Sequence, residues 1–344
     1  MPRFDEPAAP SGLPDRIGGV EISAVGGGLG PSLGWSAALG DPAFVDRRRR
    51  VPLIARPADF GATLAVGERF RYDVTFAGNP TGIAEASVVR REAGLYGAPD
   101  RVRLEGFART SGVVSLLTTL TYEMHTYVDA GTGAPIDGFA VAKRSGMGRS
   151  RKRETTTHYA GRGLVEIEDT RVADQTTTSR LRQRTPIDTF DSLSLMAWVR
   201  ALDLEPGERA RAYGLDGKTL LRVDISSKGK SRLDPMPGIG TAIGLKSDDV
   251  IELEGTISRA DRWGAVIPGK KVYKMRVWVS SDGRRIPLVL ESDIWFGVVR
   301  LILNQYDPPA ADPSPAPKAT SASASGASGA APASAGGAAP RPTP

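Results

Sequence analysis

Apolar and polar residues alternate with a period of two along much of the chain between residues 62 and 306. Within residues 69–76, every second position is apolar, from Phe70 to Phe76. Successive strand side chains point to opposite faces, so this pattern predicts a half-buried strand. The same pattern predicts further strands at 83–90, 101–108, 120–129, 151–159, 164–170, 219–226 and 249–257.

Residues 274–303 predict a three-stranded antiparallel meander. Asp282 and Gly283 are typical of a two-residue hairpin turn, because both residue types tolerate positive φ. Pairing across that turn places Val277 opposite Leu288, and the apolar side chains of both strands then share one face. The two turn residues are therefore assigned a structural role.

A second turn is predicted at residues 296–297. It would place Asp293 opposite Arg300 and Leu290 opposite Leu303. An opposite-charge pair on one face and an apolar pair on the other agree with an antiparallel register.

One helix is predicted, at residues 188–202. Thr189 or Asp191 can cap it, because a short side chain with an oxygen accepts a free N–H of the first turn. Its apolar positions fall on one stripe, formed by Leu195, Trp198, Val199 and Leu202.

The two ends of the chain lack this periodicity. Residues 1–61 are rich in Gly, Pro and Ala, and we expect them to be poorly ordered. Residues 307–344 consist almost entirely of Ala, Ser, Gly, Pro and Thr. Such a segment cannot bury enough apolar surface to offset its chain entropy, so a disordered tail is expected.

The predicted elements define a mainly β fold between residues 62 and 306. We expect a large bent antiparallel sheet or an incomplete β-barrel, with one prominent short helix. The chain has 344 residues, of which 40% are hydrophobic, so this region can bury a sizeable core.

The composition excludes several classes of site. The chain has no cysteine, which rules out disulfides and thiolate chemistry. Its formal net charge is +6, with two dense basic runs at 47–50 and 149–153. Neither run is interleaved with aromatic residues, so nucleic-acid binding is not predicted. No stretch is apolar enough for a transmembrane helix, and no secretory signal peptide is evident.

No catalytic or metal-binding constellation stands out. His125 and His158 are the only histidines, and we expect both at ordinary surface or hydrogen-bonded positions. The glycines of residues 238–244 do not match a dinucleotide-binding fingerprint, and a glycine-rich loop is expected there. The tryptophans could line an apolar pocket, but core packing is the simpler interpretation for each.

Four segments in this order resemble a known family. They are GERFRYDVTFAGNPTGIAEASV near the start, DSLSLMAWVRALDLEPGE and DGKTLLRVDI in the middle, and MRVWVSSDGRRIPLVLESDIWFGVVRLIL at the end. Together they resemble domain-of-unknown-function family 3108 of bacterial, mostly exported proteins, over roughly residues 64–304. The resemblance implies a β-rich domain of the cell envelope, with no established catalytic residues.

These observations favour a non-enzymatic protein of the periplasm or cell envelope that binds a lipid or polysaccharide in a concave sheet. The alternative functions are a hydrolase with an unrecognised site and an interaction scaffold with flexible ends. The alternative location is the cytoplasm. Trp198 is the candidate ligand contact, and Asp191 and Arg200 are expected to anchor the helix ends. No cofactor is predicted.

Overall fold

The computed structural model describes residues 60–112, 115, 118–146, 149–173, 175–294 and 297–309. The segments predicted to be poorly ordered, 1–61 and 307–344, lie outside these residues except at their inner ends. Within the described residues the fold is mainly β, as predicted: a single sheet of 15 strands and three short helices.

The strands and helices have the following bounds. The first half of the sheet consists of β1 (Arg69–Phe76), β2 (Asn79–Glu92), β3 (Arg101–Thr110), β4 (Thr119–Asp129), β5 (Pro135–Gly146), β6 (Arg149–Tyr159), β7 (Leu164–Val172) and β8 (Thr176–Arg184). The second half consists of β9 (Thr189–Phe190), β10 (Arg209–Asp216), β11 (Thr219–Ser231), β12 (Val250–Arg259), β13 (Val272–Ser280), β14 (Pro287–Ile294) and β15 (Gly297–Asp307). The helices are α1 (Phe60–Thr63), α3 (Ser192–Ala201) and α4 (Gly238–Ala242).

The sheet is built from two meanders joined in its middle. Its spatial order runs from β8 back to β1, then from β15 back to β9. Strand β1 pairs with both β2 and β15, so the first and last strands of the fold are neighbours. All pairs are antiparallel except β9 with β10. Register shifts interrupt several of these ladders, and such bulges bend and twist a sheet.

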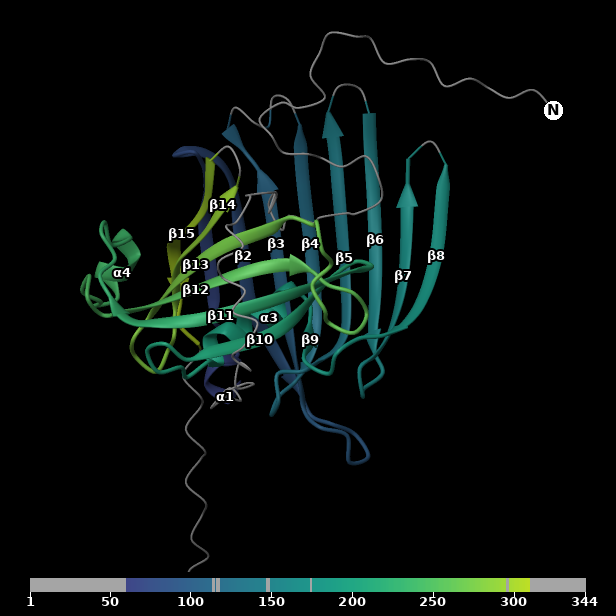
Figure 1. Cartoon of the computed structure of the whole chain (residues 1–344), viewed down its shortest axis with the longest axis horizontal. Helices are drawn as coiled ribbons and strands as arrows, with labels where there is room; N and C mark the ends of the chain where they lie inside the picture. The colour runs from purple at the N-terminus through teal and green to yellow at the C-terminus, as the bar shows by residue number, and fades with distance from the viewer. Residues whose placement is uncertain are drawn as a thin grey trace, which may run out of the picture. The chain divides into compact units, whose positions relative to one another are not determined.

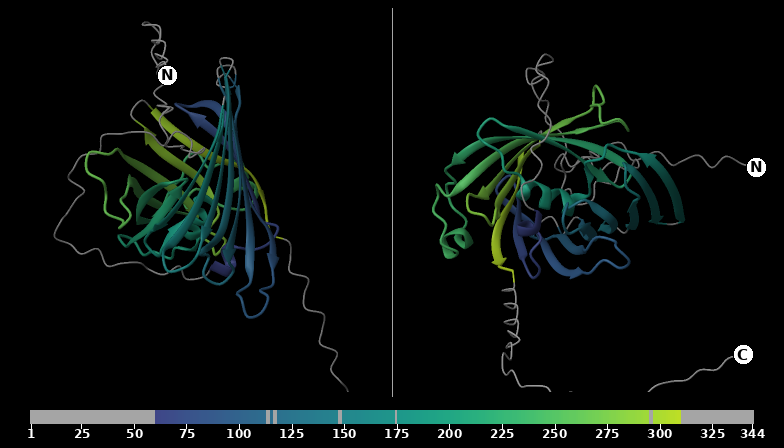
Figure 2. Two further views of the ribbon diagram at one scale, coloured as in Figure 1. Left: turned by 90° about the vertical axis from the view of Figure 1, so that its right-hand side faces the viewer. Right: turned by 90° about the horizontal axis from the view of Figure 1, so that it is seen from below.

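The sheet curls until its two ends touch through side chains. Val165 and Ile167 of β7 pack in one cluster with Leu215 and Leu220 of the β10–β11 hairpin. The Lys218 side chain also donates a hydrogen bond to the hydroxyl of Ser179 in β8. Within the described residues, no strand pairing links β8 to β9. The fold is therefore a barrel-like sheet that curls around its interior (Figures 1 and 2), with its two ends joined by side-chain packing.

Helix α3 lies within the curve of the sheet, as the right-hand view of Figure 2 shows. We call the sheet face that it packs against the inner face. Leu193 of α3 lies against Gly106 of β3, and Leu195 lies against Gly214 of β10. Asp191 is the N-cap, so the helix begins later than the predicted residue 188. Of the two proposed caps, Thr189 lies in β9 and donates its hydroxyl proton to the carbonyl of Pro186.

Several strands escaped the sequence interpretation. Strands β5, β8, β9 and β10 were not predicted. Strand β5 carries small residues at alternate positions and β8 is mostly Thr and Arg, so neither shows the expected apolar alternation. The segment predicted as a glycine-rich loop contains the short helix α4.

The predicted register of the β13–β14 hairpin is wrong by two residues. Val277 pairs with Leu290 instead of Leu288. Residues 281–286 form a loop longer than the predicted two-residue turn, and positive φ falls on Arg285 (49°) instead of Gly283. Asp282 stabilises this loop by accepting hydrogen bonds from the Ser280 hydroxyl and from the backbone N–H of Arg284. A shift of two keeps each side chain on its face, so the buried set survives the error.

The β14–β15 register shows the same kind of error. Arg300 lies opposite Glu291, with which it forms an ion pair, instead of Asp293. Leu290 lies opposite Leu301 instead of Leu303. Residues 295–296, between these strands, lie outside the described part of the chain.

A buried ion pair holds α3 in place. The guanidinium of Arg200 binds both carboxylate oxygens of Glu68, at 2.8 and 2.9 Å, and both side chains are almost fully buried. Tyr306 of β15 donates its phenol proton to the same carboxylate at 3.0 Å. The guanidinium also lies 4.7 Å from the centre of the Phe70 ring. These contacts fix the C-terminal end of α3 to β1 and β15, the neighbouring strands in the middle of the sheet.

The remaining donors of Arg200 bind backbone carbonyls. Nη1 donates to Thr63 at the end of α1, Nη2 to Arg284, and Nε to Arg285. Together with Glu68, these partners match all five N–H groups of the guanidinium. The side chain therefore connects α1, α3, the β13–β14 loop and the centre of the sheet.

Trp198 lies in the main core. Its indole is 2% exposed and packs on Phe190, with ring centres 6.1 Å apart. We therefore assign Trp198 to core packing instead of ligand contact.

Replacing Trp198 with Ala should destabilise the fold by ~3–5 kcal/mol, because a fully buried indole leaves a cavity. Trp263 is 68% exposed and provides the matched control. Chemical denaturation should show a large loss of stability for Trp198→Ala and a small one for Trp263→Ala. Equal losses would contradict the core assignment.

Replacing Arg200 with Met should cost ~3–5 kcal/mol, because it leaves the Glu68 carboxylate buried without its counterion. Adding Glu68→Gln should restore part of that loss, since the uncompensated charge is then gone. Urea unfolding of both single variants and the double variant measures this coupling. Additive losses would show that the two side chains act independently.

Candidate functional site

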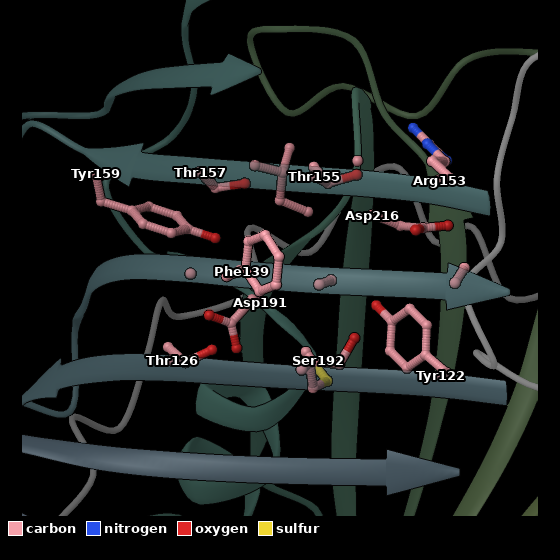
Figure 3. Close-up of a pocket in the computed structure, with 16 residues that line it drawn as sticks. Tyr122, Thr126, Phe139, Arg153, Thr155, Thr157, Tyr159, Asp191, Ser192 and Asp216 are labelled. Atoms are coloured by element: carbon pink, nitrogen blue, oxygen red, sulfur yellow. The ribbon is translucent and has the colours of Figure 1, made fainter. Parts of the chain in front are cut away.

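A polar hollow lies on the inner face of β4, β5 and β6. Strand β5 forms its floor with Gly138, Ala140 and Ala142, which alternate along the strand and so share the inner face. Side chains on the neighbouring strands are larger, including Tyr122 of β4 and Tyr159 of β6. A row of small residues between rows of larger ones leaves a trough (Figure 3).

The other wall of the pocket comes from distant parts of the chain. The first turn of α3 contributes Asp191 and Ser192, and the β10–β11 hairpin contributes Leu215, Asp216 and Gly217. The cavity has a volume of about 70 Å³. That is room for on the order of five water molecules.

Asp191 has a divided role. Its Oδ1 caps α3 by accepting hydrogen bonds from the backbone N–H groups of Leu193 and Ser194, both at 2.9 Å. Its Oδ2 is buried and has no hydrogen-bond partner in the protein. Burial raises the pKa of Asp191, and the hydrogen bonds from Ser194 and Leu193, together with the nearby Thr126 hydroxyl, only partly oppose this. One carboxylate oxygen thus serves the helix while the other faces the pocket.

Two further buried oxygens lack partners in the protein. The Thr126 hydroxyl lies on the β4 wall, close to Asp191 but outside hydrogen-bond geometry with it. The Tyr159 hydroxyl lies on the β6 wall. The Tyr159 and Tyr122 phenols both point into the pocket (Figure 3). Burial raises the pKa of both phenols, so both stay protonated and can donate hydrogen bonds.

The basic side chain of the pocket is neutralised. Arg153 donates from Nε to Asp169 of β7 at 2.6 Å, and Arg171 reaches the same carboxylate at 3.3 Å. Burial acts to raise the pKa of Asp169, but the hydrogen bond and charge of Arg153 outweigh it, and the pKa falls below its usual range. Asp169 therefore stays charged and holds Arg153 at the pocket wall.

The histidines do not reach the pocket. His158 pairs with Asp137 at 2.6 Å, and the His125 ring lies 5.3 Å from that of Phe139, on the sheet face opposite to Thr126 and Gly138. Burial lowers the pKa of His125. Within the described ranges, no group of three or more His, Asp or Glu side chains is arranged to hold a metal ion.

The tryptophans do not meet in one pocket either. Trp198 lies in the core, Trp263 is largely exposed, and Trp278 packs beside Arg276. Trp295 lies outside the described residues. None of these three described tryptophans lines the polar pocket.

The sequence interpretation missed most of the site. Asp191 was singled out as a helix anchor, and its capping oxygen has that role. Arg200 lies at the opposite end of α3, away from the pocket. The alternating small residues Gly138, Ala140 and Ala142 are the signal that could have located the trough, since small side chains facing a core leave space.

The fold and the pocket define a class: a barrel-like antiparallel sheet with an inner helix and a small polar cavity between them. The chain matches the family model "Protein of unknown function (DUF3108)" over residues 71–304. It therefore belongs to that family, as the sequence resemblance suggested. No curated protein matches the chain.

The solved structures to which this chain is similar share little sequence with it. A "beta-barrel-like protein" of domain of unknown function DUF1849 from Brucella abortus is 13% identical, with a TM-score of 0.46, over 71% of this chain and 98% of that chain. A "putative lipoprotein" from Parabacteroides distasonis is 9% identical, with a TM-score of 0.30, over 72% and 99%. A "putative exported protein with YmcC-like fold" from Bacteroides fragilis is 8% identical, with a TM-score of 0.23, over 71% and 96%.

Among the helices of the described residues, none is both long and apolar enough to cross a bilayer.

The raised pKa of Asp191 predicts a pH-dependent contribution to stability. A carboxyl whose folded-state pKa is raised contributes stability below its ordinary pKa of about 4 and loses it as pH rises through the folded-state value. Asp191→Asn keeps an N-cap acceptor but does not titrate.

The melting temperature of Asp191→Asn relative to the unmodified protein should therefore rise as the pH increases from about 4 through the raised folded-state pKa of Asp191. Thermal melts of both proteins across that range measure the difference, which cancels the titration of groups common to both. A constant difference would show that the carboxyl is not perturbed.

Proposed function

We propose that this protein is a non-catalytic binding protein of the cell envelope, and that the polar pocket holds one sugar unit of an envelope polysaccharide. The observation that carries this proposal is the set of three buried pocket oxygens without protein partners: Thr126 Oγ1, Tyr159 OH and Asp191 Oδ2. A buried polar atom left without a hydrogen bond costs about 1–3 kcal/mol. A ligand rich in hydroxyl groups would satisfy all three.

The donor and acceptor pattern suits a sugar. The Asp191 carboxylate accepts hydrogen bonds, the Tyr159 phenol donates, and the Thr126 hydroxyl does either. A sugar hydroxyl can both donate and accept, so each can find a partner among neighbouring hydroxyls. Tyr122 and Met124 add apolar surface for the less polar edge of a sugar ring.

A lipid chain suits the pocket less well. The cavity of about 70 Å³ is small, and charged and hydroxyl groups line part of it. Burying these groups against hydrocarbon would leave them without hydrogen bonds. Of the two envelope components expected from the sequence, polysaccharide is the better match.

One observation favours a hydrolase as the second candidate. Asp191 and Asp216 both line the pocket, and a carboxyl with a raised pKa can act as a proton donor. Asp191 Oδ1, however, accepts two hydrogen bonds that cap α3, so the carboxyl group is less free to transfer a proton. We therefore favour binding over hydrolysis as the function. The test below also detects cleavage of the oligosaccharide.

Envelope location is part of the proposal. It is supported by the resemblance of the sequence to a family of mostly exported proteins.

Oligosaccharides released from the envelope polysaccharide of the host should bind the unmodified protein and raise its melting temperature. Thr126→Val removes one unpaired hydroxyl at nearly constant volume. It should weaken binding about tenfold, while leaving stability unchanged or higher, because an unsatisfied polar atom is gone.

Thr156→Val is the matched control, since Thr156 lies on β6 beside the pocket residue Thr157 but points to the opposite, exposed face. It should leave binding unchanged. Calorimetric titration measures affinity, and mass spectrometry of the mixture detects cleavage. Absence of binding by any oligosaccharide would overturn the proposal, and cleavage abolished by Asp216→Asn would favour the hydrolase.

A further inference from the structure

The basic run of residues 149–153 continues the inner face beyond the pocket. Ala142 and Arg153 are paired across β5 and β6, and both line the pocket. The next pair on the same face is Arg144 with Arg151. Residues two apart on a strand are separated by about 7 Å, so this pair stands at the edge of the pocket. In Figure 1 the hairpin end of β5 and β6 lies at the rim of the sheet.

Arg144 and Arg151 are like charges placed directly opposite each other. Such a cross-strand pair is destabilising unless a counterion is present. Burial lowers the pKa of Arg144, and the charge of Arg151 lowers it further, with no carboxylate opposing either effect. Within the described part of the chain, neither guanidinium has an ion-pair partner.

The opposite face of the same two strands shows the contrast. Lys143 and Lys152 are also paired directly across β5 and β6. Here each ammonium has its own carboxylate: Glu123 for Lys143 at 3.4 Å and Glu154 for Lys152 at 2.6 Å. The chain thus neutralises a cationic pair on the outer face and leaves the pair beside the pocket without a counterion.

We infer that the ligand of the pocket is an acidic saccharide, whose carboxylate or phosphate group binds between Arg144 and Arg151 while its hydroxyl groups occupy the pocket. This inference rests on the proposed function and adds the charge of the ligand to it. Two guanidinium groups present parallel N–H donors that match the oxygens of such an anion. The neighbouring Arg153 is held by Asp169, which leaves Arg144 and Arg151 to recognise the ligand.

The test compares two pairs of substitutions that change charge equally. Arg144→Gln with Arg151→Gln removes the inner pair, and Lys143→Gln with Lys152→Gln removes the outer pair in the same register. The probes are the acidic and neutral fractions of the host's envelope oligosaccharides, separated by anion exchange, and vesicles of phosphatidylglycerol. Calorimetric titration at two salt concentrations gives each affinity.

We expect the acidic fraction to bind the unmodified protein more tightly than the neutral fraction. The inner double variant should lose at least about tenfold of that affinity, and most of its salt dependence, with no fall in melting temperature. The outer double variant should bind as the unmodified protein does.

Other outcomes overturn the inference in distinguishable ways. Equal affinities for the acidic and neutral fractions would contradict the anion subsite but would still agree with a sugar-binding pocket. Equal losses of affinity in both double variants would show that the general surface charge, and not a specific site, causes the binding of the acidic fraction. Arginine-dependent binding of phosphatidylglycerol vesicles alone assigns the pair to a lipid headgroup instead of a saccharide. If no saccharide fraction binds, both the inference and the proposed function fail.

Discussion

The ion pair between Arg200 and Glu68 is the constraint on which the position of the inner helix depends. Two ions of this kind are costly to remove from water, and geometry and hydrogen bonding must offset that cost. Here every donor of the guanidinium has an acceptor, on α1, on Glu68 before β1, or in the β13–β14 loop. Such complete matching allows one placement of α3. The placement of Asp191, at the other end of the helix, follows from it.

The pocket exists because neither the sheet nor the helix fills the interior completely. A sheet of 15 strands curls, and its ends meet here through the Val165 and Leu215 cluster without strand pairing. Helix α3 packs mainly on α1, β3, β4, β9 and β10. Next to the first turn of α3, strand β5 has only small residues on its inner face, from Gly138 to Ala142. The space left there is bounded by polar atoms from β4, β6, α3 and the β10–β11 hairpin.

The sequence was sufficient for the class of fold but not for its contacts. The alternation of apolar and polar residues predicted which side chains of β13 and β14 share a face. A register error of two residues does not change that result. Val277 was therefore assigned the correct face but the wrong partner. The turn that sets the register depends on Arg285 adopting positive φ, which residue type does not indicate. The pocket joins Thr126, Tyr159 and Asp216, which lie far apart in sequence. Only the pairing order of the strands brings them together, and local patterns do not encode that order.

The unpaired oxygens of the pocket carry the strongest argument that it has a ligand. Each buried atom without a partner costs about 1–3 kcal/mol, whereas a whole domain is stable by about 5–15 kcal/mol. Thr126 could be Val, and β-propensity would favour that change in a strand. Water that enters the cavity recovers part of the cost, but water needs two to four partners at suitable angles. These open groups, with Arg144 facing Arg151 beside them, are the observations that support the proposed ligand, an acidic saccharide.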